Sequence, residues 1–267
     1  RIGKFRNGKA VPIPGHSIPL AMLGVLILWV GWMGFNPGST LNAVANNFAD
    51  IAVNTNLAAA AGVIGATISA MVMFKTLDVS QMGNGAIAGL VAITAPCAFV
   101  DPWAAVVIGL VAGLIVPPLV VLIDKLRVDD PIGCLPVHGV AGIWGTLAVG
   151  LFATAERTTD LNLGRSEGLF LGGSGEQLWI QFYGIAATVG FTGALSLITF
   201  LAIKHTVGLR VSEAEELAGL DISEHGMFGY PERFIDVPGA EPEEATSSAV
   251  ASSSPAVTPS SQTAPTS

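Results

Sequence analysis

Charged side chains are scarce in this chain of 267 residues: Asp, Glu, Lys and Arg together make up 12% of it. Soluble domains usually carry about 25% charged residues, so the composition excludes an ordinary water-soluble fold. Hydrophobic residues make up 51% of the chain, and the mean hydropathy is +0.62. These values indicate a membrane protein. The formal net charge of -8 says little about partners, because much of it lies after residue 211.

Residue patterns that bind metals or nucleic acids are also missing. No HxxxH or CxxC spacing and no carboxylate cluster occurs inside an apolar run, and His16, His205 and His225 lie in or next to polar segments. We therefore expect no metal or haem site and no other cofactor. No basic patch or nucleic-acid motif is visible, so we expect no nucleic-acid partner. An enzyme is the least favoured class, because no nucleophile–base pair or metal constellation is present.

Long apolar runs are what the chain does have. A helix that spans a membrane needs about 20 mainly apolar residues. Six runs reach or approach this length: residues 19–35, 57–74, 83–99, 103–123, 134–152 and 178–203. The third is the weakest, since it is short and rich in Gly and Ala. The expected fold is an all-α membrane protein built as a bundle of about six transmembrane helices.

Small residues and Asp-Pro pairs add local detail. The spacings Gly85–Gly89 and Gly109–Gly113 indicate helices that pack closely, because glycine lets backbones approach each other. Asp101–Pro102 and Asp130–Pro131 each offer a carboxylate for an N-cap, followed by proline at the first helical position. Two helices are therefore expected to start at these pairs.

Basic residues indicate which ends of the runs share a side of the membrane. Ten of the twelve Lys and Arg residues lie before the first run or after the second, fourth and sixth, which is one side if the chain crosses six times. Arg157 and Arg165 lie on the other side. The positive-inside rule then places both chain ends in the cytoplasm. Cys97 and Cys134 fall at opposite sides and are not expected to pair.

The polar part that follows the last run is expected to divide in two. Ser212 and Glu215 have the spacing of a capping box that opens a short helix. The membrane region would cover residues 1–205 and a cytoplasmic regulatory segment residues 206–235. Residues 236–267 contain no basic residue and much Pro, Ser and Thr, so we expect a disordered tail. Because the first residue is Arg rather than Met, we expect the natural N-terminus to be missing.

One histidine, His138, stands alone among the apolar residues of the fifth run. Counting 1.5 Å per residue from the expected helix start puts it roughly 12 Å into the bilayer. Helical spacing places Ala141, Gly142 and Gly145 on the same face. An ionisable side chain at such depth usually faces a cavity and serves a function. The alternative is a neutral histidine that bridges two helices by hydrogen bonds.

Aromatic and hydroxyl side chains close the first run. Trp29, Trp32 and Phe35 approach its outer end, and Ser39 follows Phe35 by four residues. One interpretation is an aromatic belt at the membrane interface, which is common. The other is an external cation site, in which ring faces attract the cation and the hydroxyl accepts its hydrogen bond. A histidine within the membrane favours the cation site.

Four stretches, in this order, resemble the ammonium transporters of the Amt/Mep/Rh class, on the Amt side: "GWMGFNPGS", "GAIAGLVAITAPCAFV", "RVDDPIGCLPVHGVAGIWG" and "VGLRVSEAEELAGLDISEHG". The resemblance covers about residues 1 to 230. It implies the C-terminal half of an eleven-helix fold that forms trimers, with a narrow pore in each protomer. The first five helices would then be absent from this chain.

The same resemblance implies site residues and an activity. His138 matches the second of two pore histidines, Phe35 an aromatic residue at the outer pore mouth, and Ser39 the hydroxyl of the external ammonium site. The first pore histidine, a tryptophan and a supporting aspartate would lie in the absent helices. The implied activity is ammonium transport: the cation is recruited outside, loses its proton and crosses a hydrophobic pore as ammonia.

Partners and alternatives follow from the same comparison. The resemblance implies a homotrimer in the plasma membrane, with a P-II-type nitrogen regulatory protein that docks on the cytoplasmic face. Ser223 is a candidate for phosphorylation that would switch the cytoplasmic segment by added charge, although a turn or capping serine is the simpler interpretation. Two other functions are an ammonium sensor that binds without conducting, and a secondary transporter of another small substrate. A secondary transporter would need a broken helix or several polar groups at the midplane of the membrane.

Overall fold

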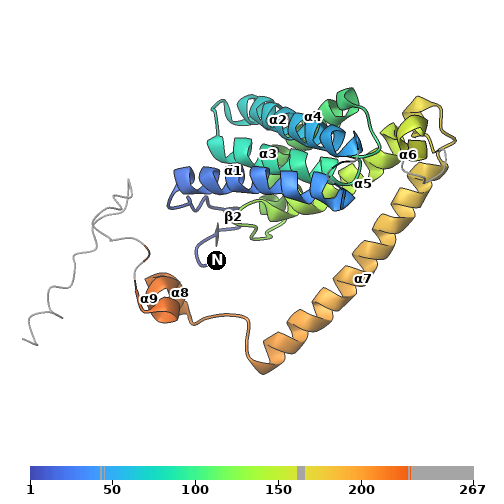
Figure 1. Cartoon of the computed structure of the whole chain (residues 1–267). Helices are drawn as coiled ribbons and strands as arrows, with labels where there is room; N and C mark the ends of the chain where they lie inside the picture. The colour runs from blue at the N-terminus through green and yellow to red at the C-terminus, as the bar shows by residue number, and fades with distance from the viewer. Residues whose placement is uncertain (43, 45, 161–165, 228, 230–267) are drawn as a thin grey trace, which may run out of the picture. The chain divides into compact units, whose positions relative to one another are not determined.

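The structure, a computed structural model, describes residues 1–42, 44, 46–160, 166–227 and 229. Arg165, Arg233 and the predicted tail at 236–267 lie outside these residues. The elements are β1 (Phe5–Arg6), β2 (Lys9–Ala10), α1 (Ile18–Phe35), the 3-10 turn η1 (Pro37–Thr40), α2 (Asn46–Phe74), α3 (Val79–Thr94), α4 (Pro102–Lys125), the π-helical turn η2 (Leu135–Val140), α5 (Ala141–Phe152), α6 (Ala155–Asp160), η3 (Leu169–Leu171), α7 (Glu176–Thr206), α8 (Glu213–Ala218) and α9 (Leu220–His225) (Figure 1). They form two compact units, Arg1–Arg210 and Val211–Ser267.

Five segments of the first unit are long and apolar enough to cross a membrane: Ile18–Thr40, Asn47–Phe74, Pro102–Lys125, Leu135–Phe152 and Glu176–Thr206. The remaining predicted run, residues 83–99, corresponds to α3, which has 16 residues and ends at Thr94. At 1.5 Å per residue this helix is shorter than a full membrane span. The all-α membrane fold is confirmed, and the protein is a multi-pass membrane protein.

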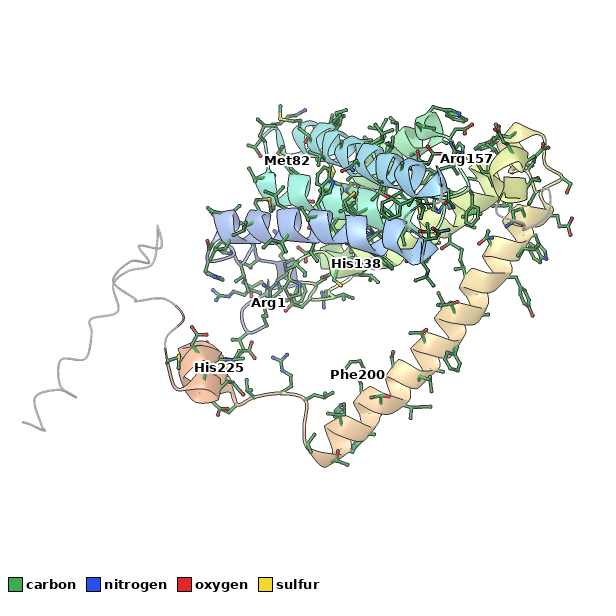
Figure 2. The ribbon with its side chains drawn as sticks, in the orientation of Figure 1. Arg1, Met82, His138, Arg157, Phe200 and His225 are labelled. Carbon is green, nitrogen blue, oxygen red and sulfur yellow. The ribbon has the colours of Figure 1, made fainter. Side chains whose placement is uncertain are left out.

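Charged side chains separate to the two ends of the helices, as Arg1 and Arg157 show in Figure 2. At one end, the N-terminal hairpin packs against the end of α4 through a Lys4–Asp124 ion pair of 2.9 Å. At the other, Arg157 of α6 binds Asp50 at 3.1 Å and Asp101 at 2.9 Å. The predicted cap at Asp101 is wrong in one respect: its carboxylate makes no capping bond and binds Arg157 instead.

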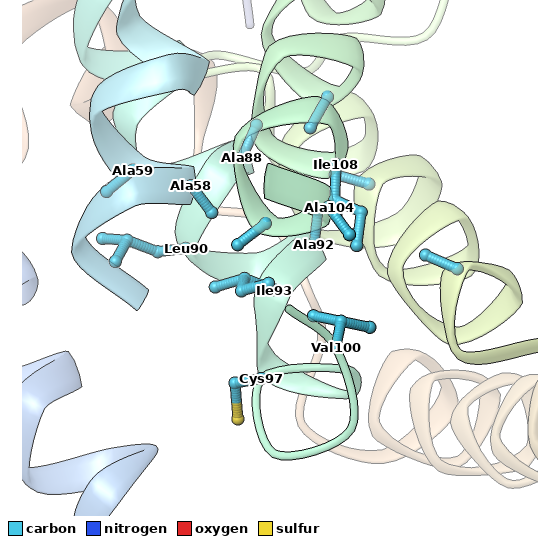
Figure 3. Packing of buried hydrophobic residues seen from close by; sticks show 14 of the residues in the cluster. Ala58, Ala59, Ala88, Leu90, Ala92, Ile93, Cys97, Val100, Ala104 and Ile108 are labelled. Atoms are coloured by element: carbon cyan, nitrogen blue, oxygen red, sulfur yellow. The ribbon is translucent and has the colours of Figure 1, made fainter. Parts of the chain in front are cut away.

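The core of the first unit lies where α2, α3 and α4 pack against one another (Figure 1). Small side chains dominate it; Figure 3 shows Ala58 and Ala59 of α2, Ala88, Leu90, Ala92 and Ile93 of α3, Ala104 and Ile108 of α4, and Cys97 and Val100 between α3 and α4. A Cβ at Gly89 or Gly109 would overlap the carbonyl of Ala58, and one at Gly85 or Gly113 that of Gly62. The predicted close helix contacts are therefore confirmed.

The start of α2 differs from the prediction. The helix begins at Asn46, well before the predicted residue 57. A stretch with Asn and Thr resembles a loop in sequence, because such side chains compete with backbone hydrogen bonds. In the structure, Asn54 and Thr55 are fully buried within the helix, where other parts of the chain supply their partners.

Helices α1 and α7 lie at the edge of the first unit, and neither has a buried residue. Two indole groups attach α1 to its neighbours: Trp29 donates to Asn56 and Trp32 to Thr94, both at 2.9 Å. Helix α7 packs at its start against α5, where Gly150 fits against Leu178. Most of the apolar surface of these helices is left exposed within the described chain.

The second unit begins with the capping box at Ser212 and Glu215, which is confirmed. The Glu215 backbone N–H donates to the Ser212 hydroxyl at 3.3 Å, and the Glu215 carboxylate accepts from the Ser212 backbone N–H at 2.9 Å. Bonds from the Ser212 hydroxyl and backbone lower the pKa of Glu215 below its usual value. Ser223 lies on α9, exposed, and its hydroxyl donates to the Leu220 carbonyl at 3.4 Å.

Candidate functional site

A cavity of about 270 Å³ lies at the outer end of α1, next to the predicted site residues. One wall comes from the end of α1 and from η1, the other from the start of α2, the end of α3 and the loop before α4. The residues that matter most below are Phe35, Asn36 and Ser39 on the first wall and Ile51, Cys97 and Phe99 opposite. The structure thus brings Phe35 and Ser39 to one cavity. Its lining residues are all uncharged.

Local folding fixes the hydroxyl of Ser39. Helix α1 ends at Phe35, and the chain continues through Pro37 into the short turn η1. This turn lets the Ser39 hydroxyl donate to the Phe35 carbonyl at 2.6 Å. A hydroxyl has one hydrogen and two lone pairs, so the remaining capacity of Ser39 is to accept hydrogen bonds. A ligand rich in N–H donors fits such a group.

The aromatic residues at this end of α1 differ in their surroundings. Trp29 and Trp32 are half-buried, pack against the core and have their indole N–H groups bonded to α2 and α3. Phe35 is 53% exposed, and its ring meets that of Trp32 edge to face at 6.0 Å. Phe35 therefore lines the cavity, as Phe99 does from the opposite wall, whereas the two tryptophans attach α1 to its neighbours.

Two polar residues that the sequence analysis did not single out hold the cavity walls in place through hydrogen bonds. Asn36 donates to the buried hydroxyl of Thr55 at 3.1 Å. Asn54 donates to the backbone carbonyls of Cys97 and Val100, both at 2.9 Å. The available signal was the polar triplet "NTN" at residues 54–56, inside an otherwise apolar stretch.

His138 lies in the π-helical turn η2, which precedes α5. The helix starts later than predicted, because a turn follows Asp130 and its carboxylate accepts the backbone N–H groups of Cys134 and Leu135, each at 2.8 Å. Counting helical rise from Asp130 therefore treated as helical a few residues that the structure places in a turn. In Figure 2, His138 lies between the end that carries Arg1 and the end that carries Arg157.

The predicted stripe of small residues beside His138 is also wrong. Ala141 is fully buried, and Gly145 packs so closely on α3 that a Cβ there would overlap the carbonyl of Ala92. The imidazole of His138 is exposed instead. A π-helical turn has i to i+5 spacing, so it rotates His138 away from the face that the regular helix presents to α3. Turns of this kind occur frequently at functional sites.

The structure does not bring all the predicted site residues together. His138 is not among the residues that line the outer cavity. Within the described part of the chain, no group of three or more His, Cys, Asp and Glu side chains could hold a metal ion. Cys97 is buried and Cys134 exposed, and both are free, which confirms that they do not pair.

Comparison with known proteins connects this geometry to a family. Residues 1–230 match the profile of the Ammonium Transporter Family. The chain is 44% identical to ammonium transporter Amt2 of Archaeoglobus fulgidus, over 86% of this chain and 50% of the relative. It is 35% identical to ammonium transporter 1 member 1 of Arabidopsis thaliana, over 86% of this chain and 49% of the relative. The chain thus spans about half the length of these curated relatives.

Solved structures agree. A structure described as a sensor Amt protein is 36% identical, with a TM-score of 0.75 over 84% of this chain and 54% of that one. Mep2 of Candida albicans is 31% identical, with a TM-score of 0.72 over 79% of this chain and 47% of that one. By sequence and by fold, the chain belongs to the ammonium transporter family, whose members are transporters rather than enzymes.

Proposed function

We propose that this chain is part of an ammonium transporter that recruits ammonium at the outer cavity and conducts ammonia past His138. The observation that supports this most is the cavity itself, which places the acceptor of Ser39 beside the exposed ring of Phe35. Ammonium carries four N–H donors and no acceptor. A hydroxyl whose own hydrogen is already used is a complementary partner for it, and an aromatic ring face attracts its charge.

Loss of a proton is the step that lowers the free-energy cost of passage through an apolar pore. A charged group in the middle of a bilayer costs at least about 2.5 kcal/mol, whereas neutral ammonia avoids that charge penalty. A neutral imidazole such as His138 both donates and accepts hydrogen bonds, so it suits guiding ammonia or relaying the proton. Potassium has no proton to lose, which gives a basis for selectivity.

Flux through the complete protein that contains this chain tests the proposal. Liposomes loaded with a pH-sensitive dye receive a pulse of ammonium outside, and the internal pH is followed with and without the protein. A protein-dependent pH change that saturates with ammonium is expected. Flux equal to that of empty liposomes would contradict the proposal.

A sensor that binds without conducting is the second candidate, favoured by the similarity to the sensor Amt protein, which has a TM-score of 0.75. The same liposome experiment separates the two. Saturable ammonium binding without flux supports the sensor, and saturable flux supports the transporter.

The proposal extends to the cellular setting. We place the protein in the plasma membrane as a homotrimer with a cytoplasmic C-terminus, in line with the basic residues near Lys4 and Lys125. Residues 206–235 would serve as a cytoplasmic regulatory segment, and a P-II-type nitrogen regulatory protein would dock on the cytoplasmic face. Ser223, exposed on α9, is accessible to a kinase in the described unit.

A further inference from the structure

We propose that Asn54 and Thr55, two neighbouring residues of α2, are positioning residues that set the separation between the two walls of the outer cavity. Through this separation they determine how the cavity discriminates between cations of different size. The proposal rests on the proposed function of the cavity as the ammonium site. Neither side chain lines the cavity, so both act through the residues that do.

Thr55 holds the first wall. Its hydroxyl donates to the Ile51 carbonyl at 2.6 Å and accepts from the Asn36 amide at 3.1 Å. Asn36 is 5% exposed and lies between Phe35, the end of α1, and the turn that carries Ser39. A single buried hydrogen bond therefore ties the segment with the proposed ligand groups to α2.

Asn54 holds the second wall. Both hydrogens of its amide are used, one on the Cys97 carbonyl and one on the Val100 carbonyl, at 2.9 Å each. These carbonyls belong to the loop between α3 and α4, whose Cys97 and Phe99 line the cavity. The amide thus bonds two carbonyls of a non-helical segment to α2, in addition to the backbone bond that Phe99 accepts from Thr154 at 2.9 Å.

An unpaired acceptor on Asn54 supports a geometric role for this residue. Asn54 is fully buried, and its Oδ1 has no hydrogen-bond partner within the described chain. A buried acceptor without a partner destabilises the fold. A leucine would avoid that loss but would leave two loop carbonyls without donors. The presence of an amide at position 54 is therefore explained by the two loop carbonyls that it holds in position.

Close backbone contacts hold α2 in place one turn after Asn54. Ala58, one turn after Asn54, has its carbonyl in contact with Gly89 of α3 and Gly109 of α4. Backbone contact on two sides opposes a shift of α2. The two anchors are adjacent in sequence, so one short, closely packed stretch of α2 bonds to both walls.

The test compares ammonium with methylammonium, which is larger by one methyl group, in the complete protein. Thr55→Val keeps the shape of the side chain and removes the bond from Asn36. Thr67→Val is the matched control, because the Thr67 hydroxyl makes the same type of bond within α2, to the Val63 carbonyl at 2.7 Å, but none that is seen to reach another helix. The measured quantity is the half-saturation concentration for each cation.

We expect Thr55→Val to lower the ratio of the methylammonium to the ammonium half-saturation concentration by about threefold or more, since a methyl group is discriminated only by a closely fitting pocket. The maximal rate for ammonium and the behaviour of Thr67→Val should stay near those of the unmodified protein. Loss of a purely structural bond would lower both rates and leave the ratio unchanged. An unchanged ratio in Thr55→Val, or an equal change in Thr67→Val, would overturn the proposal.

A second variant, Asn54→Ala, releases the opposite wall and should shift the ratio in the same direction. If this variant fails to accumulate in the membrane, Thr55→Val alone decides the proposal. Ser39→Ala distinguishes a failure of the proposed ammonium site from a failure of the positioning role. If it leaves uptake unchanged at every ammonium concentration, the cavity is not the ammonium site and both proposals fall. If it weakens uptake while Thr55→Val keeps the ratio, only the positioning role is wrong.

Discussion

Ser39 has already used its hydroxyl hydrogen on the carbonyl of Phe35, and this leaves acceptor capacity facing a cavity without charged groups. No carboxylate of this chain lines the cavity, so the Ser39 hydroxyl and the Phe35 ring are the groups by which this chain would attract the cation.

Replacing Ser39 by alanine removes that acceptor. A hydrogen bond to a charged group contributes about 1.5–3 kcal/mol, so the half-saturation concentration for ammonium should rise about tenfold or more. Uptake at low external ammonium should fall, and uptake at saturating ammonium should persist. Ser69→Ala is the control, since within the described residues the Ser69 hydroxyl makes one long bond, to the Met73 sulfur at 3.9 Å. A uniform loss at all concentrations would point to misfolding instead.

Replacing His138 by alanine should alter flux or ion discrimination and leave assembly intact, because the side chain is exposed in the described part of the chain. Competition by potassium during ammonium uptake measures the discrimination, and size-exclusion chromatography measures assembly. His205→Ala, at the end of α7, serves as control. Unchanged uptake together with unchanged selectivity would remove His138 from the pore.

Residue-level prediction from sequence succeeds where the partners are local. Phe35 and Ser39 are four residues apart, and both line the cavity. The role of Asn54 could not be predicted, because its hydrogen-bond partners lie 43 and 46 residues away in the chain. The orientation of His138 depends on a π-helical turn and on the bonds that Asp130 makes to the start of that helix, which no simple periodicity encodes.

At the scale of elements, the apolar runs predicted the existence of each long helix, and the ends differed for identifiable reasons. Helix α3 ends at Thr94, where Pro96 follows and cannot supply a backbone donor. Helix α2 starts at Asn46, because tertiary partners satisfy its polar first turns. A hydropathy analysis detects the apolar part of a helix, so it misses helical turns with polar residues that other helices bury.

Gly109→Ala tests the close contact of α2 with α4. A Cβ at this position would overlap the backbone of Ala58, which is no flexible side-chain end. Overpacking of this kind costs typically about 1–3 kcal/mol, so the melting temperature in detergent should fall. Gly31→Ala on α1 is the control, since a Cβ there meets nothing within 4 Å. Equal melting temperatures for the two variants would contradict the packing argument.

At the scale of the whole molecule, charge marks the two sides of the membrane. Lys4 and Asp124 pair at one end of the helices, and Arg157 pairs with Asp50 and Asp101 at the other. Positive charge gathers at the first end, which the positive-inside rule assigns to the cytoplasm. Sequence alone predicted this arrangement, because it depends on counting residues between apolar runs and not on side-chain geometry.

The two native cysteines report this orientation. Cys134 is exposed, and it lies at the end of the helices that the positive-inside rule assigns to the cytoplasm. A membrane-impermeant maleimide should therefore label it in inverted vesicles and not in intact cells. Cys97 is buried and should stay unlabelled in both until the protein is unfolded. Cys134→Ser should abolish the signal. Labelling of Cys134 in intact cells would reverse the orientation.

The fastening of α1 has a mechanical consequence. The side-chain hydrogen bonds that join its outer end to α2 and α3 involve Trp29, Trp32, Met33 and the following residue, Asn36. Toward the inner end, the contact with α3 is van der Waals packing of the Met22 side chain on Gly83. Helices α2, α3 and α4 meet backbone to backbone and so act as one mechanical body. We therefore expect α1 to swing at its cytoplasmic end about an outer pivot, which spin-label distances between α1 and α4, with and without ammonium, would record.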